Sequence, residues 1–204
     1  ELFNRWGGVL SAALVAILPG EVLNRSLLGF TDHHVAESLF TTVIILFLIL
    51  AVKKARERGM SFAHLVNRNW AIATRPLIYI LLAGIFLGIY LLTWSGGLLL
   101  AFVIFVWLVI QFIIDHLRGK STDYLCITGV ILFFVALLMF LPVLGKGGLG
   151  IICLISLITA IVVSLVLSGI SRLMIGKAVK PFYPLAVLGL TGIGFAVFHA
   201  MNPS

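Results

Sequence analysis

The sequence predicts an all-α polytopic membrane protein, and three observations lead to that fold class. The chain is 62% hydrophobic and only 10% charged, and its mean hydropathy is +1.23. A soluble domain carries about 25% charged residues, so this apolar excess is too large for a buried core alone. Apolar stretches recur along the chain, and basic residues gather in alternate connections between them. Helices are expected because lipid offers no hydrogen bonds to an open backbone.

Seven apolar stretches approach the length of about 20 residues that an α-helix needs to cross a bilayer. We expect about seven transmembrane helices in a single domain, with no soluble domain between them. Gly84 and Gly88 form a small-xxx-small pair, which predicts close helix contact. Cys126 and Cys153 lie inside apolar stretches, which favours small buried side chains over a disulfide. The expected helices are 6–23, 36–52, 76–94, 97–114, 124–141, 149–171 and 182–201 of the single domain 1–204.

The distribution of Lys and Arg predicts the orientation in the membrane. Twelve of the fourteen basic residues lie in alternate connections on one side, and only Arg25 and Lys146 lie on the other. By the positive-inside rule the basic side is cytoplasmic, so the loop 24–35 is extracytoplasmic. The net charge of +7 is therefore a topology signal, and no nucleic-acid-binding signature accompanies it. The cytoplasmic basic loop 53–75 is either a short amphipathic interfacial helix or a plain basic loop.

The external loop and the start of the next helix hold the main polar cluster of the chain. Ionisable groups at the edge of a membrane are costly to keep and point to a functional site. Carboxylate oxygen and imidazole nitrogen ligate divalent ions such as Mn, Mg or Zn. In an extended loop, residues two apart face the same way, so Asp32 and His34 can hold one ion while His33 points elsewhere. A solvated loop at the headgroup level is the alternative. The cluster consists of Arg25, Asp32, His33, His34 and Glu37.

Arg25 and Glu37 have two interpretations each. Thr31 or Asp32 is a plausible N-cap for the helix that begins near Val35, and a helix N-terminus favours anions such as lipid phosphate. Arg25 either adds a fixed positive charge there or simply reaches toward the interface. Glu37 either pairs with His33 at a spacing of four residues or stabilises the helix dipole.

The other titratable side chains form no second cluster in the sequence. We expect Asp115 and Asp123 to make surface ion pairs with Arg118 and Lys120, which lie between them in a short connection. The remaining histidines are isolated and are expected to be structural: His64, His116 and His199.

Two stretches of the sequence match one known family. The stretch from Arg25 to Glu37 resembles the second external loop of archaeal oligosaccharyltransferase catalytic subunits, which carries an Asp-x-Asp, Asp-x-Glu or Asp-x-His metal motif. The stretch from Gly88 to Gly97 resembles the family's Tyr-Leu-Leu-Thr-Trp-x-Gly-Gly sequence. The resemblance implies a glycosyltransferase-C type fold of thirteen helices, of which this chain holds the third to the ninth. We therefore expect an internal segment of a longer polypeptide, a view that the start at Glu1 without a methionine also favours.

The resemblance also implies an enzymatic activity. Such enzymes transfer an oligosaccharide from a dolichol phosphate or diphosphate carrier to the Asn of Asn-x-Ser/Thr in an acceptor polypeptide. By resemblance, Asp32 and His34 are ligands of a divalent Mn or Mg ion, and Asp32 and Arg25 belong to the catalytic site. Arg25, His33 and Glu37 are candidates for contact with the donor phosphate or for support of the ligands. The family's first-loop aspartate, fifth-loop glutamate and C-terminal Trp-Trp-Asp-Tyr-Gly motif are not in residues 1–204, so we expect the segment alone to be inactive.

Two alternatives remain open from the sequence. The first is another sugar transferase of the same fold that uses a polyprenyl-phosphate donor. The second is a transporter or a metal-binding membrane protein, which would need polar residues near the middle of the bilayer. The acidic residues of this chain cluster at the ends of its apolar stretches instead.

Overall fold

The computed structural model describes residues 5–17, 34–94, 96–143 and 148–174, together with Tyr183, Pro184, Val187 and Gly189. Across this part of the chain the elements are helices and the connections between them. The elements in chain order are α1 (Arg5–Ile17), α3 (His34–Glu57), α4 (Phe62–Val66), α5 (Trp70–Thr93), α6 (Gly97–Leu117), α7 (Asp123–Phe140), the 3₁₀ turn η1 (Leu141–Val143) and α8 (Gly148–Met174).

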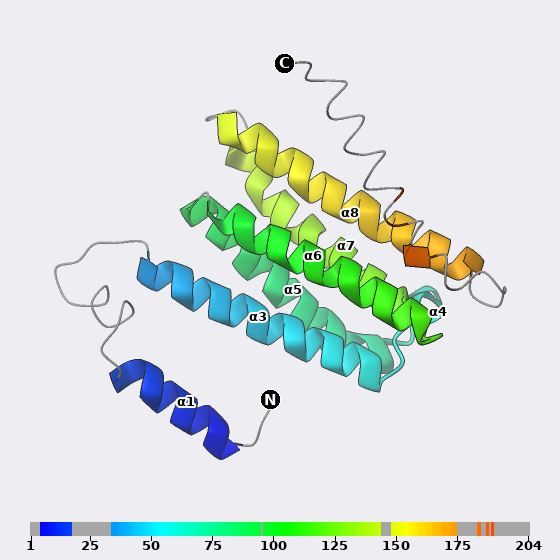
Figure 1. Ribbon diagram of the computed structural model, residues 1–204, viewed down its shortest axis with the longest axis horizontal. Coiled ribbons are helices and arrows are strands. Elements are labelled where there is room, and N and C mark those ends of the chain that lie inside the picture. Colours follow the sequence, from blue (N-terminus) through cyan, green and yellow to red (C-terminus); the bar gives the residue numbers. More distant parts are fainter. Residues whose placement is uncertain are drawn as a thin grey trace.

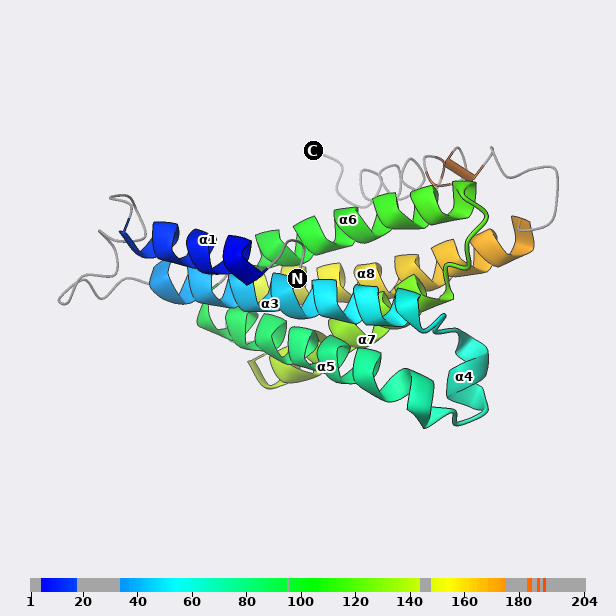
Figure 2. The same ribbon diagram turned by 90° about the horizontal axis from the view of Figure 1, so that it is seen from below.

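Five of these helices, namely α3, α5, α6, α7 and α8, are long and apolar enough to cross a membrane. The apolar helix α1 is shorter, and the expected stretch 182–201 lies almost wholly outside the described residues. The five long helices run side by side in alternating directions (Figures 1 and 2). The predicted all-α membrane fold is thus confirmed.

Helix α7 is the centre of the bundle. It packs against α3, α5, α6 and α8, and every residue from Asp123 to Gly129 is buried. Further along the helix, Phe134 and Leu138 are each 49% exposed. A helix that is apolar all round is typical of a buried or membrane-spanning position, and this fits the sequence of α7 after its first residue.

The glycine pair on α5 makes the close contact that its spacing predicts. A Cβ atom on Gly84 would lie 2.9 Å from the backbone oxygen of Leu132, and one on Gly88 would lie 2.8 Å from the Sδ of Met139. Both partners belong to α7, so the absent side chains let the two helix backbones approach each other.

Helix ends extend beyond the apolar stretches that the sequence shows. Helix α3 continues through the charged residues Lys53–Glu57, and α5 begins at Trp70, six residues before Pro76. Lys, Arg and Glu are good helix formers, so charge marks the edge of the membrane rather than the end of a helix. The connection 58–69 therefore remains between α3 and α5, and it contains the five-residue helix α4, which packs on α5 and α7.

The two ends of the bundle differ in composition. We call one the basic end: there α3, α6 and α8 finish, α5 and α7 begin, and α4 lies beside them (Figure 2). We call the other the motif end, because His34–Thr41 of α3 and the stretch Gly88–Gly97 both lie there. The basic end holds nine cations in the described residues, against Glu57, Asp115 and Asp123: Lys53, Lys54, Arg56, Arg58, Arg68, Arg75, Arg118, Lys120 and Arg172.

Candidate functional site

The structure shows where the segment that carries the predicted cluster joins the helix bundle. Arg25, Asp32 and His33 lie outside the described residues, as does His199. His34 is the first residue of α3, and Glu37 lies in the first turn of that helix. The loop with the predicted metal ligands therefore joins the bundle at the motif end, opposite the basic end.

Glu37 connects the two stretches that carry the family resemblance. The hydroxyl of Tyr90 on α5 lies near the side chains of Glu37 and Thr41, one turn apart on α3. Tyr90 is only 2% exposed, and its ring centroid lies 5.9 Å from that of Phe40 and 6.4 Å from that of Trp94. Two segments more than fifty residues apart thus meet around one tyrosine, directly beside the start of α3.

The turn between α5 and α6 explains the two glycines of the second stretch. A Cβ atom on Gly96 would lie 2.0 Å from the indole ring of Trp94, and one on Gly97 would lie 3.2 Å from the backbone nitrogen of Leu91. The amide of Gly97 also donates to the carbonyl of Trp94 at 3.1 Å. Only residues without a side chain let the indole fold over this turn, which holds Trp94 next to Tyr90.

A divalent ion suits the donor atoms of the predicted cluster. Asp32 and His34 offer a carboxylate oxygen and an imidazole nitrogen, which such ions accept. Two donors leave a coordination shell of about six incomplete. Across the described ranges, no three His, Cys, Asp or Glu side chains gather closely enough to hold a metal. An ion held by Asp32 and His34 would therefore need ligands beyond these two residues.

The basic end contains a buried polar network that the sequence reasoning missed. Asp115 is fully buried and accepts hydrogen bonds from Arg56 Nη2 at 2.8 and 3.0 Å and from Gln111 at 2.9 Å. The hydroxyl of Tyr124 donates to the same carboxylate. The expectation of a surface ion pair with Arg118 is therefore wrong, because the partners come from three helices that meet around the acid.

Asp123, the first residue of α7, follows the same pattern. It accepts hydrogen bonds from Arg172 on α8 at 3.0 and 2.8 Å, and the amide of Phe62 on α4 lies 3.5 Å from it. The Arg172 guanidinium carbon also lies 4.5 Å from the centroid of the Phe62 ring. The expected pairing with Lys120 is wrong here too, since Asp123 joins α4, α7 and α8.

His116 is also part of a cluster, contrary to the expectation that it is isolated. Its ring is fully buried, its Nδ1 lies 2.8 Å from Ser171 Oγ, and it stacks on Tyr183 with 4.1 Å between ring centroids. One signal in the sequence points to this region. Asp115 and Asp123 are the only acids after Glu57, and an acid beside an apolar stretch needs a partner. The predicted fate of the two cysteines is confirmed, because both are buried and free.

Comparison with known proteins indicates the family to which this architecture belongs. Residues 1–201 match the family "Oligosaccharyl transferase STT3, N-terminal". The chain is 28% identical over its whole length to the dolichyl-monophosphooligosaccharide–protein glycotransferase AglB of Haloferax volcanii, covering 20% of that protein. It is 31% identical over 142 residues, 70% of this chain and 15% of the relative, to dolichyl-phosphooligosaccharide–protein glycotransferase 3 of Archaeoglobus fulgidus.

Solved structures show the same relationship. An archaeal oligosaccharyltransferase AglB from Archaeoglobus fulgidus, solved with an inhibitory peptide and a dolichol-phosphate, superposes with a TM-score of 0.82 at 26% identity, covering 98% of this chain and 24% of that one. The apo form of an oligosaccharyltransferase from the same organism gives a TM-score of 0.74 at 27% identity, covering 99% and 24%. The chain spans about a fifth to a quarter of the length of these proteins. These matches confirm the resemblance seen in the sequence: the chain is an integral membrane protein that belongs to the oligosaccharyl transferase STT3 family.

Proposed function

We propose that this chain forms part of the membrane domain of an oligosaccharyltransferase. The enzyme would transfer an oligosaccharide from a dolichol mono- or diphosphate carrier to the Asn of Asn-x-Ser/Thr in a polypeptide. The observation that carries the proposal is the superposition of nearly the whole chain on the archaeal AglB structure that contains a dolichol-phosphate and an inhibitory peptide. The names of the two relatives from Haloferax volcanii and Archaeoglobus fulgidus describe the same class of transfer.

In this proposal the metal motif supplies electrostatic stabilisation. Asp32 and His34 would hold a Mn or Mg ion, which stabilises the negative charge that develops on a phosphate oxygen when a sugar leaves it. Arg25 would bring a fixed positive charge to the same donor phosphate. His33 would point away from the ion and contact the phosphate or a neighbouring ligand.

The described residues support this role by anchoring the loop. Glu37 and Thr41 lie near the hydroxyl of the buried Tyr90, and the turn at Gly96 and Gly97 holds Trp94 against the same ring. This packing sets the position at which α3 begins, and His34 is its first residue. A ligand next to a rigid helix start keeps its geometry better than one in the middle of a loop.

The positive-inside rule supports a position of the proposed site on the extracytoplasmic face. The nine cations of the described basic end all lie opposite the motif end. Cytoplasmic loops carry such an excess of Lys and Arg. A carrier lipid that presents its oligosaccharide at the outer face would therefore meet the Asp32 loop.

The test uses the complete polypeptide in membranes, with a lipid-linked oligosaccharide and an Asn-x-Thr peptide. We expect transfer in the presence of Mn or Mg, loss of transfer on chelation, and a loss of about 100-fold or more in Asp32→Ala. His34→Ala is expected to cost more than His33→Ala, its matched neighbour. An active wild type with unaffected Asp32→Ala would keep the enzyme and reject the site. No transfer to peptide, with the lipid donor verified, would instead favour a related polyprenyl-phosphate sugar transferase.

A further inference from the structure

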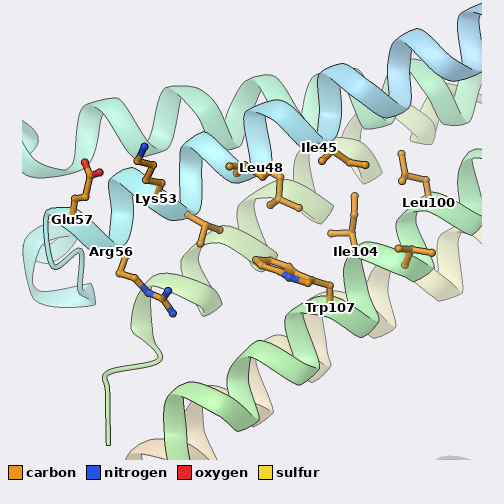
Figure 3. Close-up of a pocket in the computed structure, with 11 residues that line it drawn as sticks. Ile45, Leu48, Lys53, Arg56, Glu57, Leu100, Ile104 and Trp107 are labelled. Carbon is orange, nitrogen blue, oxygen red and sulfur yellow. The ribbon is translucent and has the colours of Figure 1, made fainter. Parts of the chain in front are cut away.

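A groove runs between α3 and α6 on the outside of the bundle (Figure 3). Its volume is about 690 Å³, within the range of about 300–1,000 Å³ that is common for sites of small ligands. Four apolar residues of α3, from Ile45 to Val52, line one wall, and four of α6, from Leu100 to Trp107, line the other. Lys53, Arg56 and Glu57 line its end, so the groove is apolar along its length and charged only at the basic end.

The dimensions of the groove fit one leaflet of a membrane. Ile45 and Lys53 are eight residues apart on one helix, which corresponds to about 12 Å at a rise of about 1.5 Å per residue. One half of a hydrocarbon core of about 30 Å measures about 15 Å. The apolar part of the groove therefore has the depth of a single lipid chain whose headgroup lies at the level of Lys53 and Arg56.

Arg56 is held in place with part of its guanidinium unused. Both hydrogen bonds to Asp115 leave from Nη2, and the guanidinium carbon lies 5.7 Å from the ring centroid of Tyr124. A guanidinium group has five N–H donors. The hydrogen bonds to Asp115 use Nη2 alone, and 43% of the Arg56 side chain remains exposed. The buried acid thus fixes an arginine whose remaining donors are available to a headgroup at the mouth of the groove.

The charge of the surrounding surface favours an anionic headgroup. The described basic end has nine cations and three carboxylates, and each carboxylate is already paired: Asp115 with Arg56, Asp123 with Arg172, and Glu57 with Lys54. Such a surface attracts anionic lipids and offers little to a zwitterionic one. Phosphate oxygens are also good acceptors for arginine.

We infer that the groove between α3 and α6 is a binding site for an anionic phospholipid. One hydrocarbon chain lies between Ile45 and Trp107, and Arg56 binds the phosphate of the headgroup at the basic end. This lipid is a component of the surrounding membrane, and the inference does not depend on the transfer reaction. Another transmembrane segment of the longer polypeptide is the competing occupant.

The first test measures lipid binding by native mass spectrometry of the complete polypeptide in detergent. The probes are phosphatidylglycerol and phosphatidylcholine with identical chains. We expect phosphatidylglycerol to bind more tightly, and Arg56→Gln to weaken its binding about tenfold, the loss of about one charged hydrogen bond. The matched control is Arg75→Gln, which removes an exposed cation away from the groove. Equal binding of the two lipids, or an equal loss in both variants, would reject a specific site.

A second variant tests the groove without touching the ion pair. Val103→Trp fills the groove, and Ile110→Trp adds the same bulk to an equally exposed position of α6 outside it; the exposed fractions are 53% and 50%. We expect only Val103→Trp to lose the lipid. This result tests lipid binding in the groove even if Arg56→Gln does not fold. A photoreactive side chain at position 103 in native membranes should then give a lipid adduct. An adduct with another segment of the polypeptide would overturn the inference.

Discussion

The basic end and the motif end of the bundle use polar side chains in different ways. At the basic end, Asp115 and Asp123 are buried against arginines from other helices, and together they join α3, α4, α6, α7 and α8. At the motif end, the described contacts centre on the aromatic ring and hydroxyl of Tyr90. The comparison shows that a costly charge in a membrane protein does not by itself mark chemistry. Its partners decide whether it holds helices together or stays available to a substrate.

Replacing one aspartate from each end should separate stability from activity. Asp115→Ala leaves Arg56, Gln111 and Tyr124 without their shared acceptor, so we expect a loss of about 2–3 kcal/mol in the free energy of unfolding. Thermal unfolding of the complete polypeptide in detergent measures this loss. The control Asp115→Asn keeps an acceptor and should lose less.

The matching variant at the motif end is Asp32→Ala, which should lose transfer while its melting temperature stays near that of the wild type. A normal melting temperature with lost turnover in Asp115→Ala would contradict the assignment of Asp115 to stability. Unfolding of Asp32→Ala would contradict the assignment of Asp32 to transfer.

A more conservative substitution tests which contacts hold the motif end together. Tyr90→Phe keeps the aromatic packing and removes the hydroxyl that lies near Glu37 and Thr41. We expect a loss of about 1 kcal/mol in the free energy of unfolding. Turnover should also fall, because the start of α3 is less firmly held. The control Tyr79→Phe removes a hydroxyl from a less buried tyrosine of the same helix, while its ring still stacks on Phe47. Similar effects from both tyrosines would show that packing alone holds this end.

The smallest effect is expected from Arg172→Lys at the basic end. Lysine keeps the charge beside Asp123 but cannot reproduce the two hydrogen bonds or the contact with the Phe62 ring. Because the Arg172 side chain is 52% exposed, the loss should be only about 0.5 kcal/mol. Arg118→Lys is the control, since Arg118 is exposed and outside both ion pairs. A loss above that of Asp115→Ala would mean that the Asp123 pair, rather than the Asp115 pair, holds the basic end.

Much of the fold could be predicted from the sequence, and the reason is the length of the apolar stretches. Hydropathy located the five long helices of the described bundle, although it placed the end of α3 and the start of α5 several residues too close to the apolar core. The Gly84 and Gly88 pair also predicted a close helix contact, which is confirmed, and the structure shows that the partner is α7. The roles of Arg25, Asp32, His33 and His34 remain predictions, because they depend on residues or side chains outside the described structure.

The ion-pair partner of each buried aspartate could be found only from the tertiary structure. Asp115 and Asp123 lie close in sequence to Arg118 and Lys120, yet they bind Arg56 and Arg172, which are 59 and 49 residues away. Proximity along the chain is a poor guide here, because a helix end exposes neighbouring residues to water while packing buries distant ones together.

By itself, the sequence determined the membrane class, the spacing of the helices and the two stretches that identify the family. These features depend on local composition, which the bilayer selects directly. Only the tertiary structure decided that the two stretches meet at Tyr90, that two acids serve as buried links between helices, and that α3 and α6 border an apolar groove. Each of these depends on contacts between helices far apart in sequence, and such contacts follow from packing of the whole bundle rather than from any one stretch.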